Sequence, residues 1–176
     1  SLEAAGIAWV ELGGVVPNPR LSLVHQGISL VEREHVDFII AVVGGSVIDS
    51  AKAIGYGAAS GGEVWDFYEG KRVPEGCLPV GVVLTIAAAG SEMSNSSVIT
   101  KEEGWIKKGY GNDICRPIFA IMNPELTMSL PDYQTACGCV DILMHTMERY
   151  FISEKTMELT DCIAEGLLRT VMEQGK

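Results

Sequence analysis

The chain has 176 residues, 47% of them hydrophobic and 20% charged, which predicts one packed globular domain or one domain and the beginning of a second. The formal net charge of −10 argues against nucleic acid or an anionic membrane as a partner and favours a small molecule. The longest uncharged apolar stretch, residues 77–90, is too short and too rich in glycine to span a bilayer, and Ser1 opens no signal sequence. We therefore expect a cytoplasmic protein.

Helix, strand and helix patterns follow one another in the first third of the chain. Apolar residues recur at helical spacing over 21–34, and the continuous apolar run 36–43 predicts a buried strand. Helical spacing resumes over 47–59, with Ser46 in the position of a helix cap and Asp49 as an acid of the first turn. The pattern predicts a strand–turn–helix unit.

The middle of the chain continues with strands and loops. Residues 80–85 read as a second buried strand, followed by a loop of small residues at 87–91 and by short strand-like pieces at 98–100 and 119–122. The charged cluster at 102–108 reads as an exposed turn, from which a lysine can also reach a phosphate. Strands that alternate with helices predict an α/β fold with a parallel sheet covered on both faces.

The pattern becomes helical throughout after Pro131. Two helices are expected, over 132–150 and 156–173. We therefore place a domain boundary near Pro131, with an α/β domain at 1–130 and the first helices of a second, all-helical domain at 131–176.

The turn at Gly44, Gly45 and Ser46 is a candidate binding site for a pyrophosphate. Glycines allow backbone N–H groups to approach a pyrophosphate, and the N-terminus of the following helix favours its negative charge. The alternative is an ordinary strand-to-helix turn in which glycine serves backbone geometry alone. The spacing is not that of the GxGxxG fingerprint. The loop within 84–92 again places small residues and hydroxyls after a strand, which is a weak signal when taken alone.

Asp141 and His145 lie four residues apart on a predicted helix and so share one face. A carboxylate and an imidazole suit a divalent metal such as iron or zinc, which needs further ligands from elsewhere. The alternative is a hydrogen-bonded pair on a helix surface. The other two histidines, His25 and His35, lie upstream and read as solvated helix and turn residues.

Four segments occur in an order and spacing that resemble the iron-containing (group III) alcohol dehydrogenases: GGSVIDSAK, LTIAAAGSEMSNSSVIT, FAIMNPELTMSLP and DILMHTMERYF. The resemblance is greatest to the NADP-dependent butanol dehydrogenase branch and runs from about Gly13 onward. Glycerol dehydrogenases and dehydroquinate synthases are rivals within the same fold, but GSEMSN and DILMH favour the butanol dehydrogenase side. Four ordered motifs are far more specific than any one of them.

The resemblance implies a dehydroquinate synthase-like fold, in which a parallel-sheet α/β domain binds NAD or NADP and an all-helical domain binds one divalent metal. Substrate would bind between them. Asp141 and His145 match the first two metal ligands. The turn before the second helix would face the pyrophosphate and nicotinamide end of the cofactor, and the second loop would line it. The implied cofactor-binding residues are Asn18, Gly44, Gly45, Ser46, Asp49, Thr85, Ala89, Gly90, Ser91 and Lys107.

Three departures from the family's pattern affect these expectations. Val43 stands where the family has the first glycine of GGGS, and a β-branched residue is poorly suited to a glycine-only conformation. Ala89 replaces a threonine and removes one hydroxyl donor, so we expect weakened cofactor binding. Relatives also begin earlier and continue beyond Lys176 into helices that carry two histidine ligands.

The resemblance therefore implies a metal-dependent alcohol dehydrogenase or aldehyde reductase, which transfers hydride between NAD(P)H and a small alcohol or aldehyde. This chain would be its central portion. The alternative is a non-catalytic nucleotide-binding or assembly fragment with an incomplete metal site. We expect a homodimer or higher oligomer, because the helices over 132–173 present a broad apolar stripe.

Overall fold

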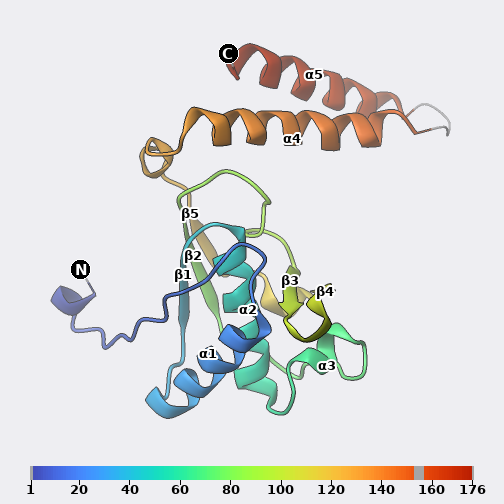
Figure 1. Cartoon of the computed structure of the whole chain (residues 1–176). Helices are drawn as coiled ribbons and strands as arrows, with labels where there is room; N and C mark the ends of the chain where they lie inside the picture. The colour runs from blue at the N-terminus through green and yellow to red at the C-terminus, as the bar shows by residue number, and fades with distance from the viewer. Residues whose placement is uncertain (1, 153–156, 176) are drawn as a thin grey trace. The chain divides into compact units, whose positions relative to one another are not determined.

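The computed structural model describes residues 2–152 and 157–175 of the chain. These residues fall into two compact units, Ser1–Leu126 and Thr127–Lys176, which divide a few residues before Pro131 (Figure 1). The first unit holds both sheets and three helices, and the second holds two helices. Short 3-10 helices lie at Glu3–Ala5, Glu103–Trp105, Asp113–Cys115 and Pro124–Thr127.

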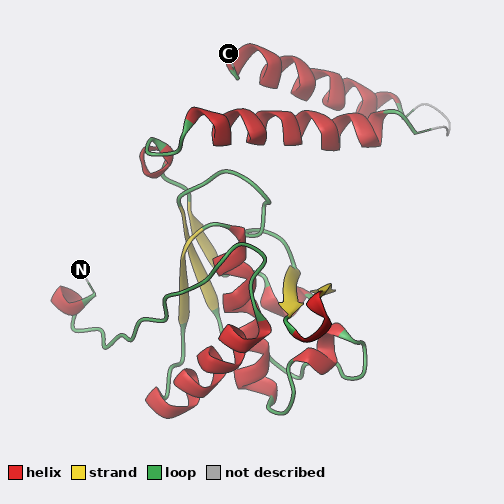
Figure 2. Ribbon diagram, viewed as in Figure 1, coloured by secondary structure: helices red, strands yellow, loops and turns green. Residues whose placement is uncertain are grey.

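The first unit contains the predicted parallel sheet. Its strands are β1 (Ile39–Val43), β2 (Val80–Leu84) and β5 (Phe119–Ile121), and Figure 2 draws strands in yellow. Their order in the sheet is β1-β2-β5. Both strand pairs are parallel, and Val43 lies opposite Leu84 where β1 and β2 end. The loops that follow these two strands therefore leave the sheet at the same edge.

Two helices pack together beside this sheet. Helix α1 (Leu21–Glu34) has the predicted bounds and buries Leu21 and Val24. Helix α2 (Gly45–Ser60) contacts β1, β2, α1 and the strand β3 (Ser96–Lys101), so its middle turns are buried almost all round. A helix with partners on several sides needs apolar residues over most of its surface, which explains the run of Ala, Ile, Gly and Tyr after its first turn.

The largest core cluster lies between α1, α2 and a short helix that the sequence did not predict, α3 (Trp65–Tyr68). Tyr56 and Phe67 are fully buried and meet Tyr110 through ring contacts. Other buried members of this cluster are Leu21, Val24, Ala53, Ile54, Val64, Trp65, Tyr68, Ile99 and Cys115. Aromatic packing thus fixes the end of α2 that lies away from Gly44.

The prediction of an exposed turn at 102–108 is wrong beyond residue 105. Strand β4 (Ile106–Gly111) pairs antiparallel with β3 (Ser96–Lys101) and forms a two-stranded sheet. The Glu103–Trp105 turn joins them, so Lys107 and Lys108 are strand residues. The mainly polar β4 carries little of the apolar alternation that identifies a strand in a sequence.

The prediction that the parallel sheet is buried on both faces is also wrong for the described residues. Helix α2 covers the face that holds Ala41, which is buried. The opposite face carries Ile40, Val42 and Ile121, which are 43%, 49% and 51% exposed. Only alternate residues of the apolar strand β1 therefore face the core.

Ser46 is not the cap of α2. The helix begins two residues earlier than a cap at Ser46 requires, and Gly44 is the N-cap, with no side-chain capping bond. The carbonyl of Gly44 accepts from the amides of Val47 and Ile48 at 3.1 and 3.2 Å. A glycine cap is acceptable here because Gly stands among the preferred N-cap residues.

The second unit is a pair of helices, α4 (Asp132–Tyr150) and α5 (Glu158–Gln174). The bounds of α4 are those predicted, and the predicted start of α5 at residue 156 lies outside the described residues. Thr146 is the one buried residue of α4, and no described residue of α5 is buried. In the described part of the chain, no helix has the length and apolar character needed to cross a membrane.

Candidate functional site

The N-terminus of α2 presents backbone donors at the end of β1. The amides of Gly45 and Ser46 precede the first hydrogen bonds of the helix, which run from Val47 and Ile48 to the carbonyl of Gly44. Both residues are partly exposed. Free N–H groups at a helix N-terminus, together with the helix dipole, favour an anion such as phosphate.

Val43 adopts a backbone conformation that normally requires glycine. Its φ angle is +142°, which lies in a region that β-branched residues rarely enter. The strand thus turns into α2 through a strained residue, as expected from the substitution of valine for the family's glycine.

The loop after β2 packs against the turn before α2. A Cβ atom on Gly44 would lie 2.6 Å from Cγ2 of Ile86, and one on Gly45 would lie 3.5 Å from Cβ of Ala89. The amide of Thr85 donates to the carbonyl of Val43 at 3.1 Å. The structure therefore brings together the two loops that the sequence singled out, with Ala89 exposed beside Gly45.

Asp49 and Ser91, both predicted to lie near a cofactor, bind each other. The hydroxyl of Ser91 donates to Oδ1 of Asp49 at 2.6 Å, and the amide of Val98 donates to Oδ2 at 3.1 Å. Burial raises the pKa of Asp49, and these two hydrogen bonds oppose that effect. Since a hydroxyl has one proton to donate, Ser91 acts here on Asp49 and holds the second loop to α2.

Asn18 and Lys107 also meet, although 89 positions separate them. Nζ of Lys107 donates to Oδ1 of Asn18 at 2.8 Å, and both side chains are exposed. The ammonium of Lys107 also acts to lower the pKa of Asp49, which places it within electrostatic range of the loops. The first unit thus gathers a helix N-terminus, a small-residue loop and an exposed cation.

Lys52 is a site residue that the sequence analysis missed. It lies in α2 one turn after Asp49, is fully buried, and directs Nζ at oxygen atoms of Ser91, Ser94 and Ser96. A lysine at the centre of an otherwise apolar helix was the available signal. The pattern alone cannot show that such a lysine is buried rather than extended to solvent.

The structure places Asp141 and His145 side by side on α4, as their spacing requires. Oδ2 of Asp141 lies 3.7 Å from Nε2 of His145, and the two side chains are 62% and 61% exposed. Glu148 approaches the other ring nitrogen at 3.8 Å, so it is on the wrong side of the imidazole to share a metal at Nε2. The residues described, 2–152 and 157–175, contain no group of three or more potential metal ligands.

The structure differs in one respect from the prediction that His25 is a solvated helix residue. Its Nε2 lies 3.0 Å from Oε1 of Glu63, and both side chains are about half exposed. The same oxygen of Glu63 accepts from the amide of Trp65 at 2.9 Å. This pair ties α1 to the start of α3.

Comparison with known proteins identifies the family. The sequence profile of the iron-containing alcohol dehydrogenases matches residues 1–124. The chain belongs to the iron-containing alcohol dehydrogenase family. It is 44% identical over 172 residues to the probable NADH-dependent butanol dehydrogenase 1 of Bacillus subtilis, an alignment that covers 98% of this chain and 44% of that protein.

Two further relatives match nearly all of this chain over less than half of their own length. The NADPH-dependent aldehyde reductase YqhD of Escherichia coli is 34% identical over 97% of this chain and 45% of its own length. The crystal structure of NADH-dependent butanol dehydrogenase A from Thermotoga maritima matches with a TM-score of 0.91 and 42% identity, over 99% of this chain and 44% of that chain. The fold predicted from the motifs is thereby confirmed, and the chain spans less than half the length of these relatives.

Proposed function

We propose that this chain forms the dinucleotide-binding part of an NAD(P)-dependent alcohol dehydrogenase or aldehyde reductase. The observation that carries the proposal is the convergence, in one unit, of the α2 N-terminus, the 85–91 loop and the Asn18–Lys107 pair. These elements come from four separated parts of the sequence. Free N–H groups and an exposed ammonium are suited to a pyrophosphate, and small residues leave room for it.

Each element has a proposed role. Gly45 and Ser46 donate backbone N–H groups to the pyrophosphate, and Gly44 allows the close approach of the second loop. Thr85, Ala89 and Gly90 line the cofactor. Lys107, positioned by Asn18, contributes a positive charge. Asp49 and Ser91 act by holding the second loop against α2, since their polar atoms already bind each other.

We propose that Asp141 and His145 contribute two ligands to a divalent metal, iron or zinc. A carboxylate oxygen and an imidazole nitrogen one helical turn apart are suitable donors. A metal bound there supplies Lewis-acid polarisation of the alcohol or aldehyde oxygen during hydride transfer to or from the nicotinamide. The role of these two residues is to bind the ion.

A calorimetric titration with NADH and NADPH tests the dinucleotide site. We expect micromolar or weaker binding, because Val43 and Ala89 each remove a feature of the family's site. Gly45→Asp places a carboxylate at the anion site and should weaken binding by about tenfold or more, which is about 1.4 kcal/mol. Gly166→Asp is the matched control, because a side chain there meets open space in α5. Equal affinities for the two variants would refute the site.

A turnover assay with butyraldehyde and either nicotinamide cofactor tests whether this chain alone is catalytic or is the second candidate, a non-catalytic nucleotide-binding fragment. With two protein ligands where catalytic metal sites commonly use three, this chain alone should show no metal-dependent turnover. Turnover that is lost on chelation and restored by iron or zinc would contradict that expectation.

We also propose that the chain forms dimers or larger assemblies. Helices α4 and α5 expose large apolar side chains, among them Val140, Met144, Leu159, Ile163 and Leu167. Exposed apolar side chains spaced four residues apart on each helix favour self-association. Light scattering at micromolar concentration should give more than the monomer mass of 18.9 kDa, and a stable monomer would overturn the proposal.

A further inference from the structure

A turn in the second loop, residues 90–96, directs its carbonyl groups at a buried cation. Nζ of Lys52 donates to the carbonyl oxygens of Ser91, Ser94 and Ser96 at 2.7, 2.9 and 2.9 Å. It also approaches the hydroxyls of Ser91 and Ser94 at 3.2 and 3.3 Å. We call residues 90–96 the carbonyl turn. One ammonium group therefore binds oxygen atoms from three residues of the carbonyl turn.

The burial of Lys52 makes these contacts necessary to the turn. The side chain is fully buried, and burial lowers the pKa of Lys52, while the nearby Cys115 and Asp49 act in the opposite direction. A buried charge is tolerated only when polar groups compensate for the lost water. Conversely, carbonyls that lose a buried donor are left without a hydrogen-bond partner, which is unfavourable. The geometry of the carbonyl turn thus depends on Lys52.

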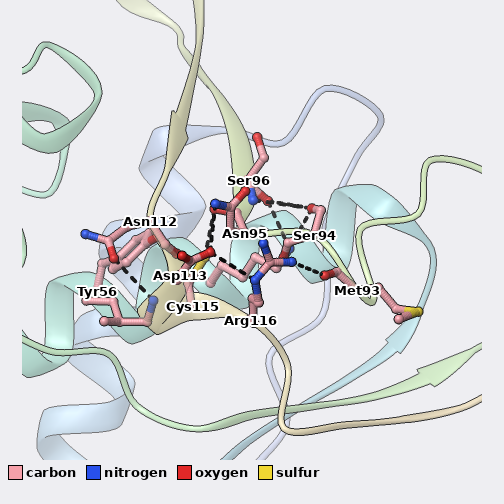
Figure 3. Close-up of polar contacts among 11 residues, drawn as sticks. Tyr56, Met93, Ser94, Asn95, Ser96, Asn112, Asp113, Cys115 and Arg116 are labelled. Atoms are coloured by element: carbon pink, nitrogen blue, oxygen red, sulfur yellow. Dashed lines mark hydrogen bonds and ion pairs between the residues drawn. The ribbon is translucent and has the colours of Figure 1, made fainter. Parts of the chain in front are cut away.

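A second cation holds the same turn from its outer side. Nη1 of Arg116 donates to the carbonyl of Met93 at 2.7 Å, and its Nε lies 3.0 Å from Oδ1 of Asp113. That carboxylate oxygen also accepts from Nδ2 of the Asn95 side chain at 3.0 Å (Figure 3). Arg116 lies near enough to Lys52 to act on its pKa. The carbonyls of the turn at positions 91, 93, 94 and 96 therefore all bind one of two cations.

The carbonyl turn is continuous with the proposed cofactor site. The hydroxyl of Ser91 reaches Asp49, and Ala89, two residues before it, lies against Gly45. The amides of Met93 and Ser94 both donate to the carbonyl of Gly90 at 3.1 Å, which closes the turn directly after the loop's last small residue. A shift of the turn would therefore move the 85–91 loop relative to the N-terminus of α2.

We propose that Lys52, assisted by Arg116, is a positioning residue of the dinucleotide site: it binds the carbonyl side of the 90–96 turn and so fixes the 85–91 loop beside Gly45. The inference rests on the proposed function, since it assigns to the loop a cofactor as ligand. Lys52 itself does not touch the cofactor. It acts through the backbone of the turn.

The test compares Lys52→Met with Lys71→Met in the full chain. Lys71 is an exposed lysine that pairs with Glu69, so its variant makes the same chemical change away from the loop. The measurements are the affinity for NADH, at a temperature where each variant is fully folded, and amide hydrogen exchange resolved by segment. Lys52→Met should weaken NADH binding at least tenfold and speed exchange in residues 90–98, with β1 and β2 unchanged. Lys71→Met should alter neither.

Arg116→Gln makes the test independent of whether Lys52→Met folds, because the Arg116 side chain is half exposed. It should weaken NADH binding about threefold and speed exchange of the same segment. A folded Lys52→Met with unchanged affinity and exchange overturns the proposal, and so does an unchanged Arg116→Gln if Lys52→Met does not fold. If the unmodified chain binds neither NADH nor NADPH, the proposed function fails, and the exchange rates alone decide whether Lys52 fixes the loop.

Discussion

The two units of this chain stabilise their helices in different ways. Helix α2 in the first unit is surrounded by α1, the parallel sheet and β3, and nine of its residues are buried. Helices α4 and α5 in the second unit contact each other and together bury only Thr146 among the described residues. In proteins, most helical stability comes from packing of an apolar face and not from local propensity. The first unit therefore holds its loops in place, whereas the second presents its side chains on a less stable support.

This difference matters for function because the two proposed ligand sites lie on different supports. The cofactor loops are joined to a buried helix by Lys52, Asp49 and Ser91. Asp141 and His145 project from a helix with almost no core. Segments with few buried contacts open at lower free energy than the rest of a protein. We expect the cofactor site to be preorganised and the metal-ligand pair to be mobile.

Removing a phenylalanine side chain from each unit should give the largest contrast. Phe67 is fully buried against Tyr56 and Tyr110, and Phe67→Ala should lower the free energy of unfolding by about 3–5 kcal/mol. Phe151 is 75% exposed, so Phe151→Ala should cost less than about 0.5 kcal/mol. Urea unfolding followed by circular dichroism measures both. Similar costs would show that the second unit has a core comparable to that of the first.

The turn before α2 offers a comparison of two adjacent glycines. Gly44→Ala would push a methyl group to 2.6 Å from Cγ2 of Ile86 and should destabilise the first unit by about 1–3 kcal/mol. Gly45→Ala meets only an ordinary contact with Ala89, and the free energy of unfolding should stay within about 0.5 kcal/mol of the parent chain. Thermal unfolding gives the comparison. A tolerated Gly44→Ala would mean that the two loops are not in close contact.

Val43→Gly should stabilise the chain, which few substitutions to glycine do. Relief of a strained backbone returns about 1–3 kcal/mol, and the flexibility of glycine costs about 0.5–1 kcal/mol, so a net gain near 1 kcal/mol is expected. Val42→Gly is the matched control, because Val42 is equally exposed and has an ordinary φ. That variant should lose stability. If both variants are destabilised alike in thermal unfolding, Val43 is not strained.

The smallest expected effect is a pH dependence at the contact between α1 and α3. Burial raises the pKa of Glu63, but the Trp65 amide and His25 outweigh it and lower the pKa below its ordinary value. A carboxyl group whose pKa is lower in the folded state than in the unfolded state stabilises the protein at pH values above its unfolded-state pKa. This contribution is lost as the pH falls through the folded-state pKa. The midpoint of thermal unfolding should therefore fall less steeply at acid pH in Glu63→Gln than in the parent chain. If the midpoint falls equally steeply in both, Glu63 makes no such contribution.

The sequence predicted those elements whose patterns are local. The bounds of α1 and α4 follow from apolar periodicity, and the turn at Gly44 from its glycines. Strand β4 was missed because its mainly polar residues form a strand only through pairing with β3. The cap at Ser46 was assigned wrongly because a glycine two residues earlier can also begin a helix.

The candidate site could be predicted only in part, because it too depends on contacts between residues that lie far apart in the sequence. The resemblance pointed to Asn18 and Lys107, which the structure brings within 2.8 Å, but no local pattern joins residues so far apart. Lys52 was missed because the burial of a charged side chain depends on the carbonyls that the fold brings to it. Chemistry that arises from tertiary contacts becomes visible only in the folded chain.

Backbone NMR during a titration with NADH would show whether the first unit holds the dinucleotide at the α2 N-terminus and the loop beside it. We expect shifts of the amide signals of Gly45, Ser46 and residues 85–91, with smaller changes at Asn18 and Lys107 and none in α5. Shifts confined to α4 and α5, or the absence of any shift at millimolar NADH, would contradict it.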